Sequence, residues 1–164
     1  YPYFYIFITL IGLSVIAGCQ SQRNDVLEFG GRAPDFEGVD LSGSPVKLAD
    51  FKEVPVVLRF FEPNCKYCKA DTKIFNDYYQ RYSSKGLTII YISTEPKLDE
   101  TKKFVDDLGI AFSVIIDKDR KISQSYRVKV VPQTIVLDPD HTIIGAILGG
   151  VSQAELDELL LSYL

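Results

Sequence analysis

Apolar residues gather in short unbroken runs in the middle of the chain, and more polar segments separate these runs. An unbroken apolar run of this kind is typical of a strand that is buried on both faces of a sheet. We therefore expect buried strands at residues 54–61, 87–93 and 112–116.

The segments between these runs have apolar residues at the three- and four-residue spacing of an amphipathic helix. We expect helices over residues 66–84 and 98–108, ended by Gly86 and Gly109 respectively. Residues 118–128 are expected to be helical in part. The apolar positions of the first helix, which we assign to core packing, are Ile74, Phe75, Tyr78, Tyr79 and Tyr82.

Two hairpins are expected at opposite ends of this alternating region. Residues 133–138 and 142–148 have the pattern of two strands, and the turn-forming residues 139–141 join them. His141 lies in this turn, where we expect a surface side chain. A smaller hairpin is expected within residues 36–48, with its turn at residues 42–44.

The chain closes with an expected helix over residues 152–164. Ser152 and Glu155 have the spacing of a capping box, in which each side chain satisfies a backbone N–H at the start of a helix. The order of elements is strand, helix, strand, helix, strand, hairpin, helix. Such alternation predicts an α/β domain with a central mixed sheet flanked by helices and an N-terminal hairpin extension.

Composition narrows the classes of function. The chain has 164 residues, which suits a single domain, and a net charge of −4. A nucleic-acid-binding protein usually has a basic surface, so we expect no nucleic-acid partner. A single histidine argues against histidine-rich metal sites, and three cysteines leave an odd one to explain.

The first residues account for one cysteine. Residues 1–16 are apolar or aromatic apart from a few small polar residues and carry no charge. This run is shorter than the roughly 20 residues of a membrane-spanning helix and suits the apolar region of a signal peptide. The pair Ala17 and Gly18 before Cys19 resembles the lipobox of bacterial lipoproteins, which implies a lipid on Cys19 and attachment to a bilayer.

These features predict three parts. Residues 1–18 are a signal peptide, residues 19–27 hold the lipidated cysteine and a tether, and residues 28–164 form the domain. The chain lacks an initial Met and a basic leading segment, so we expect the signal peptide to be truncated at its start. An uncleaved signal anchor, or a core helix with a chance cysteine, stays open as an alternative.

The other two cysteines form the motif Cys65-Lys66-Tyr67-Cys68 at the junction of a buried strand and a helix. One helical turn brings two such sulfurs within disulfide range. The first lies at the helix N-terminus, where backbone N–H groups and the helix dipole favour a thiolate. We expect Cys65 to be the nucleophile and Cys68 to resolve the mixed disulfide. Half of a zinc site, or a structural disulfide, stays open.

Five segments together resemble the thioredoxin-like proteins of the TlpA/ResA group. They are Gly31-Arg32-Ala33-Pro34-Asp35-Phe36, Leu48-Ala49-Asp50-Phe51-Lys52, Cys65-Lys66-Tyr67-Cys68, Val131-Pro132-Gln133-Thr134 and Leu137-Asp138. The resemblance implies a thioredoxin fold, a cis-proline at Pro132 beside the cysteine pair, and thiol–disulfide exchange outside the cytoplasm. It implies a reductant of protein disulfides without a dissociable cofactor, often tethered to a membrane and re-reduced by a donor of the DsbD/CcdA type.

The motif departs from this group at three positions. The group usually has Trp before the first cysteine, often Pro before the second, and Trp at the end of the preceding strand. Here these residues are Asn64, Tyr67 and Phe61. Lys66 adds a positive charge beside Cys65, which favours the thiolate and a more oxidising couple.

Two charged residues lie near the motif in sequence. Asp71 falls where some ResA-like members carry a glutamate that moves protons to or from the cysteines, so we count it as a candidate catalytic residue. The alternative is an acid that only complements the helix dipole. Arg59 lies within an apolar strand and needs a partner, Asp71 or Glu62, unless it reaches solvent at an edge.

Two other functions occur on the same fold. A peroxiredoxin-type peroxidase needs Thr or Ser three residues before its cysteine, and Glu62 stands there for Cys65. A copper-binding module of the Sco type has three residues between its cysteines and a downstream histidine. Soft thiolates suit Cu(I), but here the spacing is two residues and His141 lies in a turn.

Overall fold

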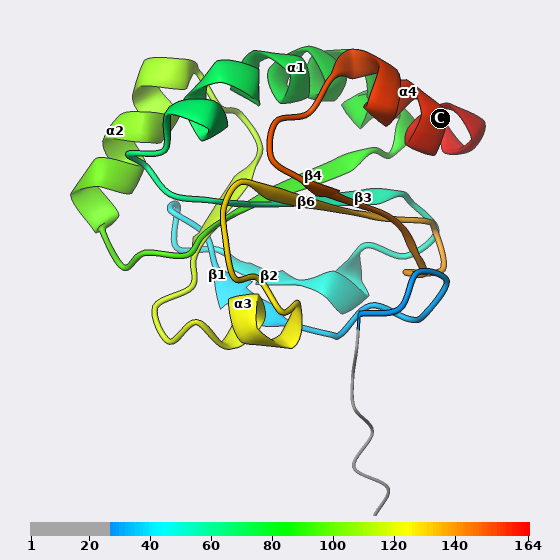
Figure 1. Cartoon of the computed structure of the whole chain (residues 1–164), viewed down its shortest axis with the longest axis horizontal. Coiled ribbons are helices and arrows are strands. Elements are labelled where there is room, and N and C mark those ends of the chain that lie inside the picture. Colours follow the sequence, from blue (N-terminus) through cyan, green and yellow to red (C-terminus); the bar gives the residue numbers. More distant parts are fainter. Residues whose placement is uncertain (1–26) are drawn as a thin grey trace, which may run out of the picture.

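The computed structural model describes residues 27–164. Its main feature is a five-stranded mixed sheet with the order β5-β4-β3-β6-β7 (Figure 1). Strand β3 is central, parallel to β4 and antiparallel to β6, while β5 extends the parallel side and β7 the antiparallel side. The strands are β3 (Val56–Phe61), β4 (Thr88–Ser93), β5 (Ser113–Ile116), β6 (Gln133–Leu137) and β7 (Ile143–Leu148).

Helices cover one face of this sheet, and a short helix with a small hairpin covers the other (Figure 1). The first group is α1 (Lys66–Tyr82), α2 (Leu98–Leu108) and α4 (Gln153–Leu160). The second is α3 (Lys121–Ser125) with β1 (Glu37–Val39) and β2 (Pro45–Lys47). Short 3-10 helices are Leu48–Asp50, Ser83–Lys85 and Leu161–Tyr163.

Strand β3 separates two apolar cores. Every residue of β3 is buried, as the unbroken apolar run predicts. Its alternate residues Leu58 and Phe60 join the core on the α3 side, while Val57 and Phe61 join the core under α1 and α2. Because β3 ends where α1 begins, the cysteine motif lies at the carboxyl end of the central strand.

The N-terminal hairpin covers the β5 edge of the sheet. A backbone bridge joins Asp40 to Ile115. Gly38 approaches the same residue so closely that an added Cβ would lie 2.8 Å from the Ile115 Cγ2 atom. The turn is held by the Asp40 carboxylate, which accepts hydrogen bonds from the backbone N–H groups of Ser42 and Ser44.

The helix boundaries confirm the expected signals. Gly109 ends α2 in the left-handed conformation with φ of 61°, and Gly86 adopts φ of 100° after the 3-10 turn that follows α1. The capping box of Ser152 and Glu155 is present at the start of α4. The expected helix within residues 118–128 is confined to the five residues of α3.

The predicted signal peptide and Cys19 lie outside the described residues, as does most of the tether. Within residues 27–164, no helix is long and apolar enough to cross a membrane.

Candidate active site

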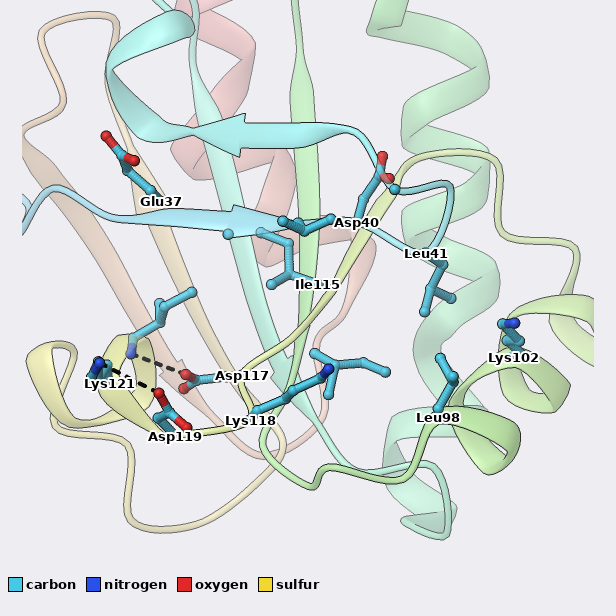
Figure 2. Close-up of a pocket in the computed structure, with 15 residues that line it drawn as sticks. Glu37, Asp40, Leu41, Leu98, Lys102, Ile115, Asp117, Lys118, Asp119 and Lys121 are labelled. Atoms are coloured by element: carbon cyan, nitrogen blue, oxygen red, sulfur yellow. Dashed lines mark hydrogen bonds and ion pairs between the residues drawn. The ribbon is translucent and has the colours of Figure 1, made fainter.

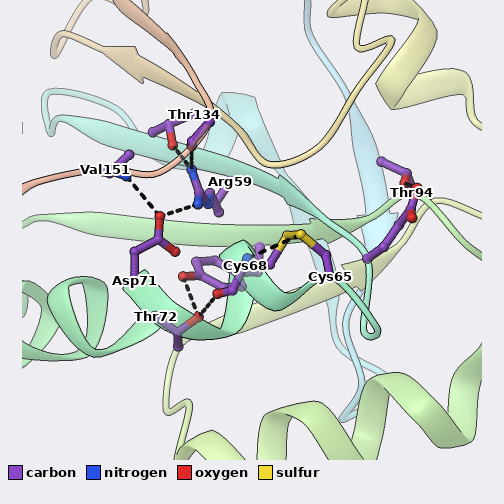
Figure 3. The surroundings of a disulfide bond; sticks show 11 residues. Arg59, Cys65, Cys68, Asp71, Thr72, Thr94, Thr134 and Val151 are labelled. Atoms are coloured by element: carbon purple, nitrogen blue, oxygen red, sulfur yellow. Dashed lines mark hydrogen bonds and ion pairs between the residues drawn. A yellow bond between two sulfur atoms is a disulfide. The ribbon is translucent and has the colours of Figure 1, made fainter.

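Cys65 and Cys68 form a disulfide at the N-terminus of α1 (Figure 3). Cys65 is the N-cap residue, and its sulfur accepts a hydrogen bond from the backbone N–H of Cys68 at 3.2 Å. The Cα atoms are 5.2 Å apart. In the reduced protein the same N–H group and the helix dipole would stabilise a thiolate on Cys65.

The two cysteines differ in accessibility. Cys65 is partly exposed, whereas the exposed fraction of Cys68 is 1%. Of the two residues, Cys65 is thus the one that lies nearer the surface, where an incoming disulfide would arrive. This asymmetry fits the predicted roles of an attacking and a resolving thiol.

The loop before the motif is fixed by contacts to two elements. The backbone N–H of Cys65 donates to the Glu62 carbonyl, and the Thr94 hydroxyl donates to the Glu62 carboxylate at 3.1 Å. The Asn64 amide donates to Glu100 of α2 at 2.6 Å. These bonds hold the segment that precedes Cys65 against the end of β4 and the start of α2.

Pro132 has the predicted cis peptide bond with Val131. Strand register places Phe60 opposite Gln133, so one further step brings Pro132 opposite Phe61 at the end of β3. Its carbonyl accepts a hydrogen bond from the Gly149 N–H at 2.8 Å. Pro132 therefore belongs to the edge of the sheet from which the cysteine motif emerges.

Arg59 and Asp71 form a buried ion pair, which resolves the choice of partner for Arg59. Arg59 Nη2 lies 2.5 Å from Asp71 Oδ2, and Arg59 is fully buried. Its Nη1 donates to the Thr134 hydroxyl at 2.7 Å and to the Gly149 carbonyl at 3.1 Å. The same Oδ2 atom of Asp71 accepts from the Val151 N–H at 2.9 Å (Figure 3).

Burial and pairing act in opposite directions on this pair. Burial raises the pKa of the Asp71 carboxyl, while the Arg59 charge and the Val151 N–H lower it. Burial lowers the pKa of the Arg59 guanidinium, and the Asp71 charge opposes that change. A guanidinium starts from so high a pKa that it stays charged. Burial is the larger effect on Asp71, so the pKa of its carboxyl lies above the ordinary value, while Arg59 stays a cation beside it beneath α1.

Two hydroxyl groups complete the polar cluster beneath the disulfide. The Thr72 hydroxyl donates to the Cys68 carbonyl at 2.7 Å and lies 3.3 Å from the Tyr91 hydroxyl. Burial raises the pKa of Tyr91, which is therefore a neutral phenol near neutral pH. Both residues pack against the turn of α1 that carries Cys68.

His141 corrects the prediction of a surface side chain. It is buried, and its Nε2 lies 2.6 Å from the Phe51 carbonyl. His141 follows β6, whose last residue pairs with Val56 at the start of β3, so it lies at the end of the sheet away from the cysteines. The histidine is therefore not placed to share a metal with Cys65 and Cys68.

A pocket of about 520 Å³ opens between the β1–β2 hairpin, the end of β5 and the start of α2 (Figure 2). Its lining mixes lysines with acids, and Lys121 pairs with Asp119 at 3.4 Å. Neither cysteine lines it. Residues 27–164 contain no group of three or more His, Cys, Asp or Glu side chains that could hold a metal ion.

The structure brings Cys65, Cys68 and Asp71 onto one face of α1, with Pro132 at the adjoining sheet edge. Sequence reasoning missed three partners of the ion pair, the Thr134 hydroxyl, the Gly149 carbonyl and the Val151 N–H. Thr134 lies in the quoted proline segment but carried no assigned role. The backbone N–H of Val151 has no sequence signal, because any residue at that place could donate it.

A thioredoxin fold with two cysteines, separated by two residues, at the N-terminus of its first long helix defines a class of thiol–disulfide exchange proteins. The chain is similar to solved members of this class. A putative thiol:disulfide interchange protein DsbE from Chlorobium tepidum matches with a TM-score of 0.78 and 24% identity, over 84% of this chain and 99% of that one. The thioredoxin domain of a thiol-disulfide oxidoreductase from Bacteroides vulgatus matches with a TM-score of 0.73 and 29% identity, over 81% and 97%.

Residues 29–146 match the model of the AhpC/TSA family, and the chain belongs to this family. It is 32% identical over 150 residues to the thiol-disulfide oxidoreductase ResA of Bacillus cereus, covering 92% of this chain and 86% of the relative. ResA of Geobacillus kaustophilus is 27% identical over 94% of this chain and 88% of its own. The resemblance to the TlpA/ResA group is thus confirmed, and the chain is a thiol–disulfide oxidoreductase.

Proposed function

We propose that the chain works outside the cytoplasm, exchanging disulfides with protein substrates through Cys65 and Cys68, and that it acts as a reductant. The observation that carries the proposal is the asymmetric pair, a partly exposed Cys65 at the N-cap of α1 bonded to a buried Cys68. Relatives named thiol-disulfide oxidoreductase support the chemistry.

Reduction of a substrate takes two exchange steps. The Cys65 thiolate attacks one sulfur of the substrate disulfide, which forms a mixed disulfide and releases the other substrate sulfur as a thiolate. Cys68 then loses its proton, and its thiolate attacks the Cys65 sulfur. This forms the Cys65–Cys68 disulfide and releases the second substrate thiolate. Two electrons pass to the substrate, whose two thiolates take up two protons.

We assign two further residues to these steps. Asp71 follows Cys68 by one turn on the buried face of α1, where side chains three residues apart are neighbours. Its carboxylate is proposed to take the proton that Cys68 loses. Pro132 is proposed to shape the substrate contact at the sheet edge beside the motif, as the TlpA/ResA resemblance implies.

We propose that the domain is attached to the outer side of a membrane through a lipid on Cys19, facing the periplasm or its equivalent. The apolar run before the small residues Ala17 and Gly18 supports this. Expression with a complete signal sequence should give a membrane-bound protein with acyl groups on Cys19. A Cys19→Ala variant should carry no acyl group. Membrane-bound wild-type protein that carries no acyl group on Cys19 would contradict the lipid anchor and favour a signal anchor.

A reductant needs a source of electrons after each cycle. We propose a membrane donor of the DsbD/CcdA type, whose own dithiol would reduce the Cys65–Cys68 disulfide. The direction of electron flow is tested by measuring the reduction potential of the Cys65–Cys68 couple, equilibrated with mixtures of reduced and oxidised glutathione. A potential below about −200 mV supports a reductant, whereas one near about −120 mV assigns the protein to the oxidants.

The exchange mechanism itself is tested by trapping. The reduced protein should reduce a model substrate such as insulin, and Cys65→Ser should abolish this activity. Cys68→Ser should leave the first step intact and accumulate a mixed disulfide, visible by mass spectrometry. Accumulation on Cys68 in the Cys65→Ser variant instead would reverse the two roles.

A further inference from the structure

The central strand carries a charged residue where its neighbours in sequence are all apolar. Arg59 lies fully buried beneath α1 and contacts groups from three other parts of the chain. Its guanidinium carbon also lies 5.1 Å from the centre of the Phe75 ring. These contacts fix the position of the Arg59 guanidinium. The Asp71 carboxylate that it binds is therefore held in one position as well.

The two oxygens of the Asp71 carboxylate have different surroundings. Oδ2 accepts hydrogen bonds from both Arg59 and the Val151 N–H. Oδ1 is buried and has no hydrogen-bond partner among residues 27–164. The carboxylate is therefore held through one oxygen, and the other stays available to accept a proton within the protein interior.

We propose that Arg59 is a positioning residue that holds Asp71 as a carboxylate with Oδ1 free to take the proton of Cys68. The inference rests on the proposed role of Asp71 in the second exchange step. Among residues 27–164, Arg59 forms no hydrogen bond with Cys65 or Cys68. It would therefore act on the second exchange step only through Asp71.

Electrostatics support this assignment. The groups around the ion pair are the Phe75 ring of α1, Tyr91 of β4, the Thr134 hydroxyl of β6 and the backbone of the segment after β7, which supplies the Gly149 carbonyl and the Val151 N–H. None of these carries a charge while Tyr91 is a phenol. Arg59 is therefore the cation that partly offsets the effect of burial, which raises the pKa of Asp71.

Loss of Arg59 has a defined consequence for the reaction. An opposite charge in contact typically lowers a carboxyl pKa by about 1–3 units. Without it Asp71 would hold its proton to higher pH and could not accept one from Cys68. The low-pH limb of the profile of the second exchange step should then shift to higher pH by about 1–3 units, and at pH values below that limb its rate should fall about tenfold for each unit of the shift.

The test follows both exchange steps with 5,5′-dithiobis(2-nitrobenzoate), which releases one coloured thiolate when Cys65 attacks it and a second when Cys68 resolves the mixed disulfide. Stopped-flow traces between pH 5 and 9 are compared for the wild type, Arg59→Met, Arg59→Lys and Asp71→Asn. Arg59→Met should move the pH profile of the second phase upward. Arg59→Lys keeps a cation and should move it less. Asp71→Asn should remove from the second phase the pH dependence that the Asp71 carboxyl contributes.

The control is Arg81→Met, which removes an exposed arginine from the last turn of the same helix and should leave the profile unchanged. Superimposable wild-type, Arg59→Met and Arg59→Lys profiles would overturn the inference. If Arg59→Met does not fold, Arg59→Lys decides alone, by whether its profile moves. A wild type that shows the first phase without the second would instead overturn the proposed exchange mechanism, so the two failures are distinguishable.

Discussion

The guanidinium of Arg59 occupies the helix-covered face of the central strand, and its position there depends on Asp71. Taking both charges out of water is costly, and their attraction with the surrounding hydrogen bonds offsets that cost. Removing only one partner leaves the other charge buried and uncompensated. The pair is therefore more sensitive to single substitutions than to joint replacement by apolar residues.

Arg59→Met should lower the free energy of unfolding by about 3–5 kcal/mol at pH 7, the usual cost of breaking a buried ion pair. The deficit should be smaller at acid pH. Without Arg59, the folded-state pKa of Asp71 lies further above its unfolded value of about 3.9. Such a group stabilises the fold below its unfolded pKa, and this stabilisation is lost as pH rises through the folded pKa.

Urea unfolding of the wild type and Arg59→Met at a series of pH values measures this difference. Arg81→Met removes an exposed arginine that forms no ion pair among residues 27–164, so it serves as the control and should follow the wild type throughout. A deficit that grew on acidification would mean that Asp71 does not take up the proton in the variant.

His141 gives a second prediction at this scale. It adopts a left-handed φ of 60° and bonds the Phe51 carbonyl. Asn tolerates this backbone conformation but is too short to make the bond. His141→Asn should therefore cost about 1–3 kcal/mol, because it removes the donor to a partly buried carbonyl.

Exchange activity of the His141→Asn variant should be unchanged, since the residue lies at the end of the sheet away from the cysteines. Chemical denaturation and the rate of insulin reduction measure the two effects, with exposed Asp140→Asn as the matched control. Loss of activity at wild-type stability would contradict this separation of the two ends.

Residues differ in how far sequence alone predicts their roles. The two-residue spacing of Cys65 and Cys68 at a strand–helix junction is a local signal, and it was enough to predict that the two cysteines form a pair. Arg59 had two candidate acids within twelve positions, and only the packing of α1 over β3 selects Asp71. The burial of His141 depends on Phe51, which is 90 positions away, so the turn in which it lies suggested the surface.

Helix α4 illustrates how an element far from the cysteines supports the site. Its N-cap, Ser152, directly follows Val151, whose N–H binds Asp71. The Ser152 hydroxyl lies 3.3 Å from the Glu155 N–H, and the Glu155 carboxylate accepts from the Ser152 N–H at 2.8 Å. The capping box thus fixes the entry of the chain into α4 and, with it, one donor to the carboxylate.

Ser152→Ala should cost about 0.5–2 kcal/mol, the usual value for loss of an N-cap side chain. Glu155→Gln keeps a group able to complete the box and should cost less. Thermal unfolding of the two variants compares them. Equal destabilisation would indicate that the Glu155 charge at the helix N-terminus matters more than the box.

Elements were predictable where their signals are local. The bounds of α2 agree with prediction because its apolar stripe ends at a glycine. Strands β3 to β5 are recognisable as unbroken apolar runs, since burial on both faces removes alternation. The extent of α3 was not predictable, because its five residues are capped by the buried Asp117 carboxylate, which accepts from Ile122 and Ser123 N–H groups.

At the scale of the whole molecule, the reduction potential of the cysteine pair is linked to the free energies of unfolding of the oxidised and reduced forms. Folding and disulfide formation share one thermodynamic cycle, so a fold that favours the disulfide makes the couple more reducing, and one that favours the dithiol makes it more oxidising. Cys68 is buried among apolar residues, which accommodate an uncharged disulfide sulfur more readily than a charged group. Lys66 lies at the exposed end of the motif, where solvent screens its charge.

We therefore predict that the oxidised protein is more stable than the reduced protein. Urea unfolding of the two forms, with the reduced form kept under excess dithiol, should give a higher midpoint for the disulfide form. Each 30 mV by which folding shifts the couple corresponds to about 1.4 kcal/mol between the two unfolding free energies. Cys65→Ser controls for the reductant, because it cannot form the disulfide and should have one midpoint under both conditions. A reduced form more stable than the oxidised form is the behaviour of oxidants such as DsbA, and it would reverse the proposed direction of electron flow while leaving the exchange mechanism intact.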